Sequence, residues 1–283
     1  MKSLTIKNLG RLLVVVLTIS IFACEIDGTT DPSDDDSNVA DGLKEALRVG
    51  TDTAVSVLNV ENGYFADQAV KILLPDDIQK AIGDFKSASM SLGFITVSGE
   101  DVYNGYTNSA LGIDIPGLKS KEDDLILGIN RAAETAAKDA KPIFVDAITG
   151  MTISDANDIL FGDDTAATHY LRSNTYSSLF DSFEPKIDEA LNTVKVGDES
   201  VAQLYEDYVK DYNDVLNTSV SGFGTVGSLL GVNAVSEPYL SEFATNEGLD
   251  GLFLKVSEEE KNIRENPLAR VTELLQSVFA ALD

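Results

Sequence analysis

Cys24 and His169 are the only cysteine and the only histidine of this chain, and they limit its nucleophilic and metal chemistry. A zinc site of the usual nitrogen and sulfur type needs several such ligands. A serine–histidine–acid triad would have to use His169, and the chain has no G-x-S-x-G motif to carry the serine. The sequence therefore predicts neither a zinc site nor a catalytic triad, and His169 is interpreted as an ordinary helix residue.

Two further spacings match binding motifs without the context that their chemistry needs. Gly222, Gly224 and Gly227 fit the dinucleotide pattern G-x-G-x-x-G, but a helical pattern precedes them where the motif needs a strand. Oxygen-bearing residues between positions 34 and 45 fit a calcium loop, but Val39 stands where the turn requires glycine. No metal, cofactor or catalytic residue is predicted.

The residues before Cys24 have the pattern of an export signal. Three positive charges precede an apolar run that is about half of the ~20 residues needed to cross a bilayer. Ile21-Phe22-Ala23-Cys24 resembles a bacterial lipobox, which implies cleavage before Cys24 and acylation of its thiol and new amino group. We therefore expect a lipoprotein signal peptide at 1–23 and attachment to the membrane through lipid on Cys24. The expected location is the cell envelope, at the periplasmic face of the outer membrane or at the cell surface.

The composition is strongly acidic. The chain has 47 Asp and Glu against 21 Lys and Arg, a formal charge of −26. Such a surface repels phosphate backbones, so nucleic acid is not expected as a partner. Residues 24–38 are rich in Asp and Ser, lack apolar periodicity, and predict a flexible acidic tether. Residues 39–283 remain as the folded domain.

Apolar residues recur every three or four positions through most of this domain, which is typical of amphipathic helices. The sequence therefore predicts an all-α fold: a single irregular multi-helix domain behind the signal peptide and the tether. Pro142 is expected to kink a helix or begin a new one, and Pro185 and Pro267 are expected to break helices. Ser257 and Glu260 form a capping-box pattern that predicts the start of the last helix.

One helix carries polar residues among alanines. Asn130, Arg131 and Glu134 are three and four positions apart and share one side of it. Small neighbours would let another helix approach and bury them, and buried polar groups need partners. The C-terminal region offers such partners, so we predict that the two segments meet in one network near any ligand cleft; solvated surface charges are the alternative. The candidate cluster is Asn130, Arg131, Glu134, Arg264, Asn266 and Arg270.

Two stretches read as loops because they are rich in small and polar residues. They are 94–118, a probable insertion, and 219–235. Only FITVSG, which begins at Phe94, has a weak two-residue alternation. Long loops within a compact domain are often functional.

Four stretches carry a family resemblance. They are DGLKEALRVGTDTAV (41–55), FADQAVKILLPDDIQ (65–79), the long stretch from INRAAETAAKDAKPIF to SFEPKI (129–187) and LDGLFLKVSEEEKNIRENPLARV (249–271). Together they resemble a bacterial family of exported, largely helical proteins, the domain of unknown function DUF4197. The resemblance implies an extracytoplasmic helical domain and implies no activity. Residues 94–118 stand where relatives have a short connection, and 236–248 also depart from the family pattern.

These features predict a noncatalytic, lipid-anchored helical protein that binds an unknown protein or small molecule in the bacterial envelope. A hydrolase that acts through carboxylates is one alternative, although with 47 acids chance alone makes many carboxylate pairs. A structural envelope protein that self-associates is the other.

Overall fold

The computed structural model describes residues 32–236 and 239–279, with side chains from residue 39 onward. The predicted signal peptide 1–23, Cys24 and the following residues to position 31 lie outside this part of the chain.

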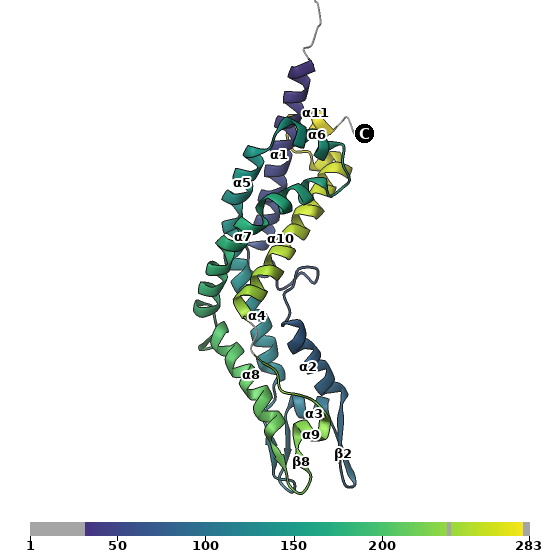
Figure 1. Cartoon of the computed structure of the whole chain (residues 1–283), viewed down its shortest axis with the longest axis vertical. Coiled ribbons are helices and arrows are strands. Elements are labelled where there is room, and N and C mark those ends of the chain that lie inside the picture. The colour runs from purple at the N-terminus through teal and green to yellow at the C-terminus, as the bar shows by residue number, and fades with distance from the viewer. Residues whose placement is uncertain (1–31, 237–238, 280–283) are drawn as a thin grey trace, which may run out of the picture.

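The described chain forms an elongated body (Figure 1). Helix α1 (Pro32–Leu58) begins at one end of the long axis, and α11 (Glu273–Phe279) packs against it there. Helix α1 starts inside the segment 24–38 that the sequence predicts as a tether. The backbone of residues 32–38 thus continues the first helix.

The other helices follow in chain order. They are α2 (Asp76–Ser87), α3 (Gly99–Asn104), α4 (Lys119–Ala136), η1 (Ala137–Asp139), α5 (Ala140–Gly150), α6 (Ile153–Leu160), α7 (Ala166–Thr193), α8 (Val201–Asn217), α9 (Val226–Leu230), α10 (Leu240–Glu265) and η2 (Pro267–Ala269). The strands are β1 (Ser89–Leu92), β2 (Ile95–Ser98), β3 (Tyr106–Asn108), β4 (Ile113–Ile115), β5 (Lys195–Val196), β6 (Glu199–Ser200), β7 (Ser219–Val220) and β8 (Gly224–Thr225).

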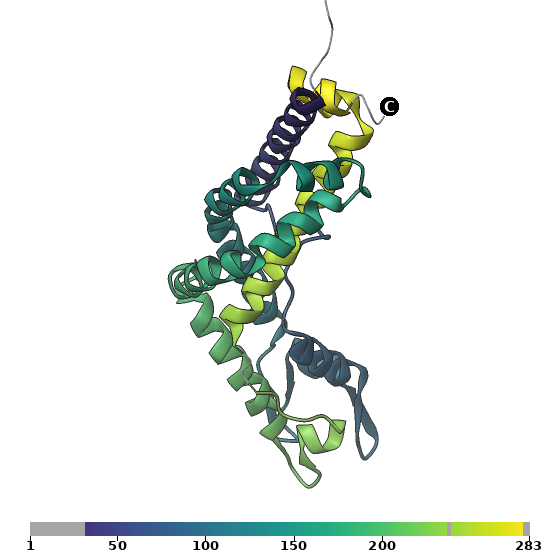
Figure 2. The ribbon, with the colours of Figure 1, turned by 45° about the horizontal axis from the view of Figure 1, so that its top comes forward.

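The fold is all-α, as predicted, and the strands in the described residues form two-stranded antiparallel hairpins. Helix α10 packs against α7 and α1, and α7 also packs against α4 and α5 (Figure 2). The buried face of α1 includes Leu43, Leu47, Ala54 and Leu58, which recur at the spacing of a helix stripe. Their burial against α10 and its neighbours forms one continuous core.

Helix α10 is the central helix of the body, and it runs without interruption from Leu240 to Glu265. The capping box predicted at Ser257 and Glu260 is therefore wrong. Ser257 lies within the helix, and the Glu260 carboxylate contacts a different helix, as described below. At Gly251, a β-carbon would lie only 2.9 Å from the Tyr64 ring, so glycine lets α10 approach that residue closely.

The prolines have different effects. Pro142 lies in the first turn of α5, and Pro267 follows the end of α10, as predicted. Pro185 does not break its helix, because α7 continues to Thr193. Both Pro185 and Asp181, whose carbonyl loses its usual donor, are exposed, so water can replace the missing backbone hydrogen bond.

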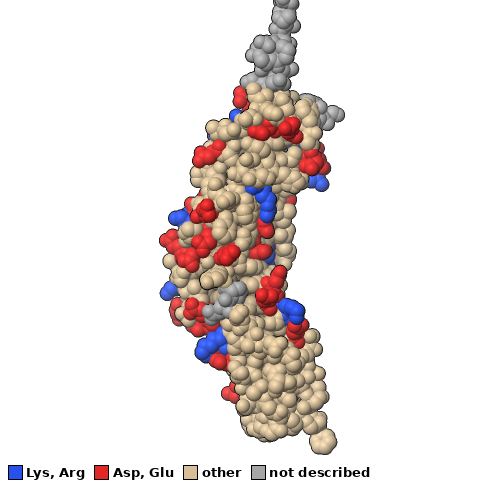
Figure 3. Space-filling view, in the orientation of Figure 1, with Lys and Arg blue, Asp and Glu red and all other residues tan. Residues whose placement is uncertain are grey.

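The end of the body opposite to α1 contains the two stretches predicted as loops, together with β1 and the end of α8. Residues 94–118 contain β2, α3, β3 and β4, and 219–235 contain β7, β8 and α9. The loop prediction is therefore wrong for both, because these elements are too short for a sustained periodic pattern. Only FITVSG, with its weak alternation, corresponds to a strand, β2. Val97, Tyr103 and Ile113 bury their side chains there. On the face shown in Figure 3, the lowest part of this end shows no charged side chain. Residues 94–118 also carry the exposed acids Glu100, Asp101 and Asp114.

Candidate interaction surface

Asn130, at 0% exposure, binds the backbone of the segment that joins α1 to α2. Its Oδ1 accepts a hydrogen bond from the Ile72 N–H at 2.9 Å, and its Nδ2 donates to the Ile72 carbonyl at 2.7 Å. The amide therefore pairs with both backbone groups of one extended residue, as a neighbouring strand would. Helix α4 supplies the rigid support, and Nδ2 also donates to the Ile126 carbonyl one turn earlier.

Glu134 lies one turn further along α4 and holds the same segment. Its Oε1 accepts hydrogen bonds from the backbone N–H groups of Tyr64 and Phe65, each at 3.2 Å. Its Oε2 accepts from Arg131 Nη1 at 2.6 Å, and Arg131 Nη2 donates to Asn62 Oδ1 at 2.9 Å. These contacts hold the segment 59–74 against α4. We call Asn130, Arg131 and Glu134 the clamp.

Tyr64 extends the clamp to α10. Its hydroxyl donates to the Gly248 carbonyl at 2.8 Å. Burial, and secondarily the charge of Glu134, raises the pKa of Tyr64 far above its ordinary value, so the hydroxyl stays a donor at all physiological pH values.

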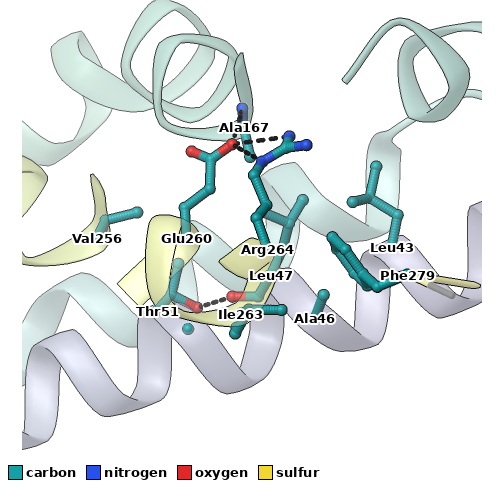
Figure 4. Close-up of a pocket in the computed structure, with 11 residues that line it drawn as sticks. Leu43, Ala46, Leu47, Thr51, Ala167, Val256, Glu260, Ile263, Arg264 and Phe279 are labelled. Atoms are coloured by element: carbon teal, nitrogen blue, oxygen red, sulfur yellow. Dashed lines mark hydrogen bonds and ion pairs between the residues drawn. The ribbon is translucent and has the colours of Figure 1, made fainter. Parts of the chain in front are cut away.

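A second buried group lies far along α10. Glu260 Oε1 accepts from the Ala167 N–H at 2.9 Å, and its Oε2 accepts from the Thr168 N–H and hydroxyl, both at 2.8 Å (Figure 4). These are the first N–H groups of α7, which have no partner within their own helix. Glu260 therefore caps α7 from a neighbouring helix, with a negative charge at the positive end of the helix dipole.

Arg264 completes this group at the end of α6. Its Nε donates to Glu260 Oε1 at 3.1 Å, and its two terminal nitrogens donate to the carbonyls of Leu160 and Ile159 at 3.1 and 2.8 Å. Glu260 and Arg264 together thus provide hydrogen-bond partners for the N–H groups at the start of α7 and the carbonyls at the end of α6. The cavity beside it has a volume of about 20 Å³ and largely apolar walls, which is room for about one water molecule and not for a ligand (Figure 4).

Arg270 and Asn266 stabilise the chain where α10 ends. Arg270 is buried and donates to the carbonyls of Ile263 and Arg264 at 3.1 and 2.8 Å. Asn266 is exposed, and its side chain accepts from the Leu268 N–H at 3.1 Å. Arg270 thus satisfies carbonyls at the end of α10, and Asn266 caps the short helix η2 that follows.

The single network predicted from the sequence is therefore two separate groups. The alanine face of α4 does bring α10 close, but it meets Gly248, where an added β-carbon would lie 3.8 Å from that of Ala133. Gly248 and Arg264 are more than four helical turns apart, about 24 Å. The register of α10 thus places Arg264 beside α6 and α7, while backbone groups of 62–72 bind the polar residues of α4. Glu260 was missed as a partner because its spacing from Ser257 resembled a local cap.

An open groove of about 690 Å³ runs beside the clamp. Its walls include Arg131, Glu134 and Lys195. Both oxygens of Glu134 are already hydrogen-bonded, and Glu61 in the same wall pairs with Arg131 at 3.3 Å. A carboxylate hydrolase needs two facing carboxyl groups that are available to substrate, and the described groove walls do not supply such a pair.

The end of the body opposite to α1 takes part in neither the clamp nor the helix caps. We define the uncharged tip as residues 87–99, 102–113 and 215–236, three segments without Asp, Glu, Lys or Arg. The Ser221 N–H donates to the Leu111 carbonyl at 3.2 Å, and α9 packs on β1, so the three segments form one unit. The acids Glu100, Asp101 and Asp114 interrupt these segments in the sequence.

Large apolar side chains project from this tip. Phe94, at 110% exposure, follows the positive-φ residue Gly93 in the turn between β1 and β2, and Ile95 beside it is exposed as well. Phe223 is exposed in the turn between β7 and β8. Figures 1 and 2 place both hairpin ends at the end of the body opposite to α1. The tip is therefore convex, uncharged and partly apolar, which are properties of a contact surface.

Residues 32–236 and 239–279 contain no cluster of three or more acid, histidine or cysteine side chains that could hold a metal ion. In the same part of the chain, no helix is both long and apolar enough to span a membrane.

A family model described as protein of unknown function (DUF4197) matches residues 33–94 and 108–280. Searches of curated proteins and of solved structures give no significant match. The unmatched residues 95–107 contain β2 and α3 and lie within the insertion predicted at 94–118. Because the matched residues make up most of the chain, the protein belongs to the DUF4197 family of proteins of unknown function.

Proposed function

We propose that this protein is a noncatalytic interaction protein of the bacterial envelope, anchored by lipid on Cys24, with the uncharged tip as its contact surface. The observation that carries the proposal is the arrangement of the body. The chain enters the described structure at the end where α1 begins, and the tip lies at the opposite end of the long axis (Figures 1 and 3).

This arrangement suits an anchored protein that reaches away from its membrane. An acidic body is repelled by other acidic surfaces, and this repulsion is weakest where the surface carries no charge. The tip is therefore the part of the described body that can approach a partner most closely. The polar residues that looked most functional in the sequence act instead as a clamp and as helix caps, which favours a rigid binding protein over an enzyme.

Attachment is tested with Cys24→Ala in the cells that make the protein. We expect the wild type to fractionate with membranes, to incorporate labelled fatty acid, and to yield an N-terminal peptide that begins with acylated Cys24. The variant should lose the label and remain uncleaved. An unlabelled wild type with a free Cys24 thiol would show that the anchor does not exist.

The self-associating structural role is tested separately. Light scattering of the chain from residue 24 onward, with Cys24→Ser, should give the mass of a monomer. A stable higher mass at micromolar concentration would favour the structural role over the binding role.

A further inference from the structure

We propose that the uncharged tip binds the surface of a lipid bilayer with zwitterionic headgroups by inserting Phe94, Ile95 and Phe223. This proposal rests on the proposed function only in taking the tip as the contact surface. It does not require the lipid on Cys24.

The shape of the tip favours a bilayer over a protein partner. Phe94 and Phe223 stand at the ends of two hairpins and project outward. Three such side chains bury at most about 600 Å², which is less than the about 800 Å² that each partner contributes to a standard protein interface. A bilayer deforms around projecting side chains and needs no matching pocket, so a small convex apolar tip can bind it. For the same reason, two tips would form a poor dimer interface.

The charges of the tip select the type of lipid. The three segments have no Lys or Arg, so they offer nothing to attract anionic headgroups. The protein as a whole has a formal charge of −26 and is repelled by an anionic surface. The nearest acids, Glu100, Asp101 and Asp114, are exposed and negatively charged, with hydrogen bonds from the neutral side chains of Asn104, Ser98 and Thr107. These acids add to the repulsion from an anionic surface, so the tip favours a neutral lipid surface.

The polar residues of the hairpins fit the same position. Ser91 and Thr96 are paired across β1 and β2, and Ser219 is paired with Thr225 across β7 and β8. Their hydroxyl groups can hydrogen-bond to headgroup phosphate and ester oxygens at the depth where the phenylalanine rings enter the acyl boundary. Apolar side chains flanked by neutral hydrogen-bonding groups match the two layers of a bilayer interface.

The test uses the chain from residue 24 onward with Cys24→Ser, which has neither acyl chain nor signal peptide and contains every described residue. Flotation with phosphatidylcholine vesicles measures its partition coefficient. We expect binding that changes by less than about twofold across the range in which salt screens surface charges. Vesicles with anionic phosphatidylglycerol should bind the chain more weakly.

Phe94→Ser and Phe223→Ser should each lower the partition coefficient by about tenfold, because each removes one inserted ring. Phe161→Ser is the matched control. Phe161 is also exposed, at 67%, but it ends α6 in the other half of the body. Equal binding by the tip variants, or loss of binding in the control instead, would overturn the proposal. So would the absence of any binding to phosphatidylcholine.

A second readout does not depend on how the serine variants fold. The Cys24→Ser chain has no other thiol. An environment-sensitive dye can therefore be attached at one position only, to the new cysteine of Ile95→Cys or of Phe161→Cys. Phosphatidylcholine vesicles should shift the emission of the dye at position 95 to the blue and leave the dye at 161 unchanged. No shift at 95 would contradict insertion. If light scattering instead shows that tip variants break a dimer, the tip is an interface between copies and the lipid proposal fails, while anchoring through Cys24 would be unaffected.

Discussion

Glu260 and Arg264 lie one turn apart on α10, and their side chains join the start of α7 to the end of α6. The Arg264 Nη2–Glu260 Oε1 distance is 3.0 Å, and both side chains are buried at 6% exposure. Neither residue caps its own helix. The pair therefore fixes three helices relative to one another, and its loss should affect the whole half of the body that contains α6 and the start of α7.

Glu260→Ala should lower the free energy of unfolding by about 3–5 kcal/mol, because it leaves the buried Arg264 without its charge partner and the first N–H groups of α7 without an acceptor. Urea unfolding of the Cys24→Ser chain measures the change. Glu265→Ala is the control, because Glu265 is exposed in a 3.8 Å pair with Lys261 and its loss should cost less than about 0.5 kcal/mol. Equal midpoints for the two variants would show that the cap contributes nothing.

The separation of the two polar groups predicts which double variants are additive. Glu134→Ala and Arg264→Ala share no contact, so their effects should add to within about 0.5 kcal/mol. Glu260→Ala and Arg264→Ala share a contact, so the double variant should cost less than the sum. The same unfolding series measures both cycles. Strong coupling between Glu134 and Arg264 would mean that the single network predicted from the sequence exists after all.

Asn130→Ala should release the segment 59–74 without unfolding the body. It removes the acceptor of the Ile72 N–H and the donor to the Ile72 carbonyl, and leaving buried polar groups unpaired costs about 1–3 kcal/mol. Hydrogen exchange should become faster at Ile72 in particular. Asn192→Ala is the control, because Asn192 is exposed and only donates to the Asp188 carbonyl on its own helix. Unchanged exchange at Ile72 would contradict the clamp.

Asp67 should make stability depend on pH at the acid end. A hydrogen bond from Lys255, and another from the Ala69 N–H, hold the pKa of Asp67 below its ordinary value of 3.8. A folded-state pKa below the unfolded value gives stability that is present above pH 3.8 and is lost as the pH falls through the lowered pKa. Asp67→Asn should therefore lower stability at pH 7, by up to about 1 kcal/mol, and have little effect near pH 2.

Asp84→Asn provides the comparison for this titration, because Asp84 forms an exposed pair with Lys80 at 2.6 Å. Its variant should change the urea midpoint less at pH 7, since exposed pairs contribute little. An Asp67→Asn effect of the same size at both ends of the pH range would rule out the titration of Asp67 as the cause.

The long helices could be predicted from the sequence because their buried residues repeat over many turns, as Leu43, Leu47 and Leu58 do in α1. The tip could not. Strands of two to four residues give at most a weak alternation, as FITVSG does over β2, and glycine, serine and asparagine are typical both of loops and of tight hairpins.

The site could be predicted only in part, because residue types show that a group needs a partner and not where that partner lies. Asn130, Glu134 and Arg264 are buried and paired as expected. Many of their partners are backbone groups of distant segments, such as the Ile72 and Leu160 carbonyls. Every residue has such groups, so the sequence does not show which of them will be partners. Only the register of α10 against α4 and α7 decides which of them meet.

The most direct measurement is photo-crosslinking in intact cells, with the lipid anchor in place and a photoreactive residue at position 95 or 161. If the tip is the contact surface, irradiation should give a discrete adduct from position 95, to lipid or to a partner protein, and none from position 161. Adducts of equal yield from both ends, or from position 161 alone, would contradict the assignment of the tip as the part of this protein that binds.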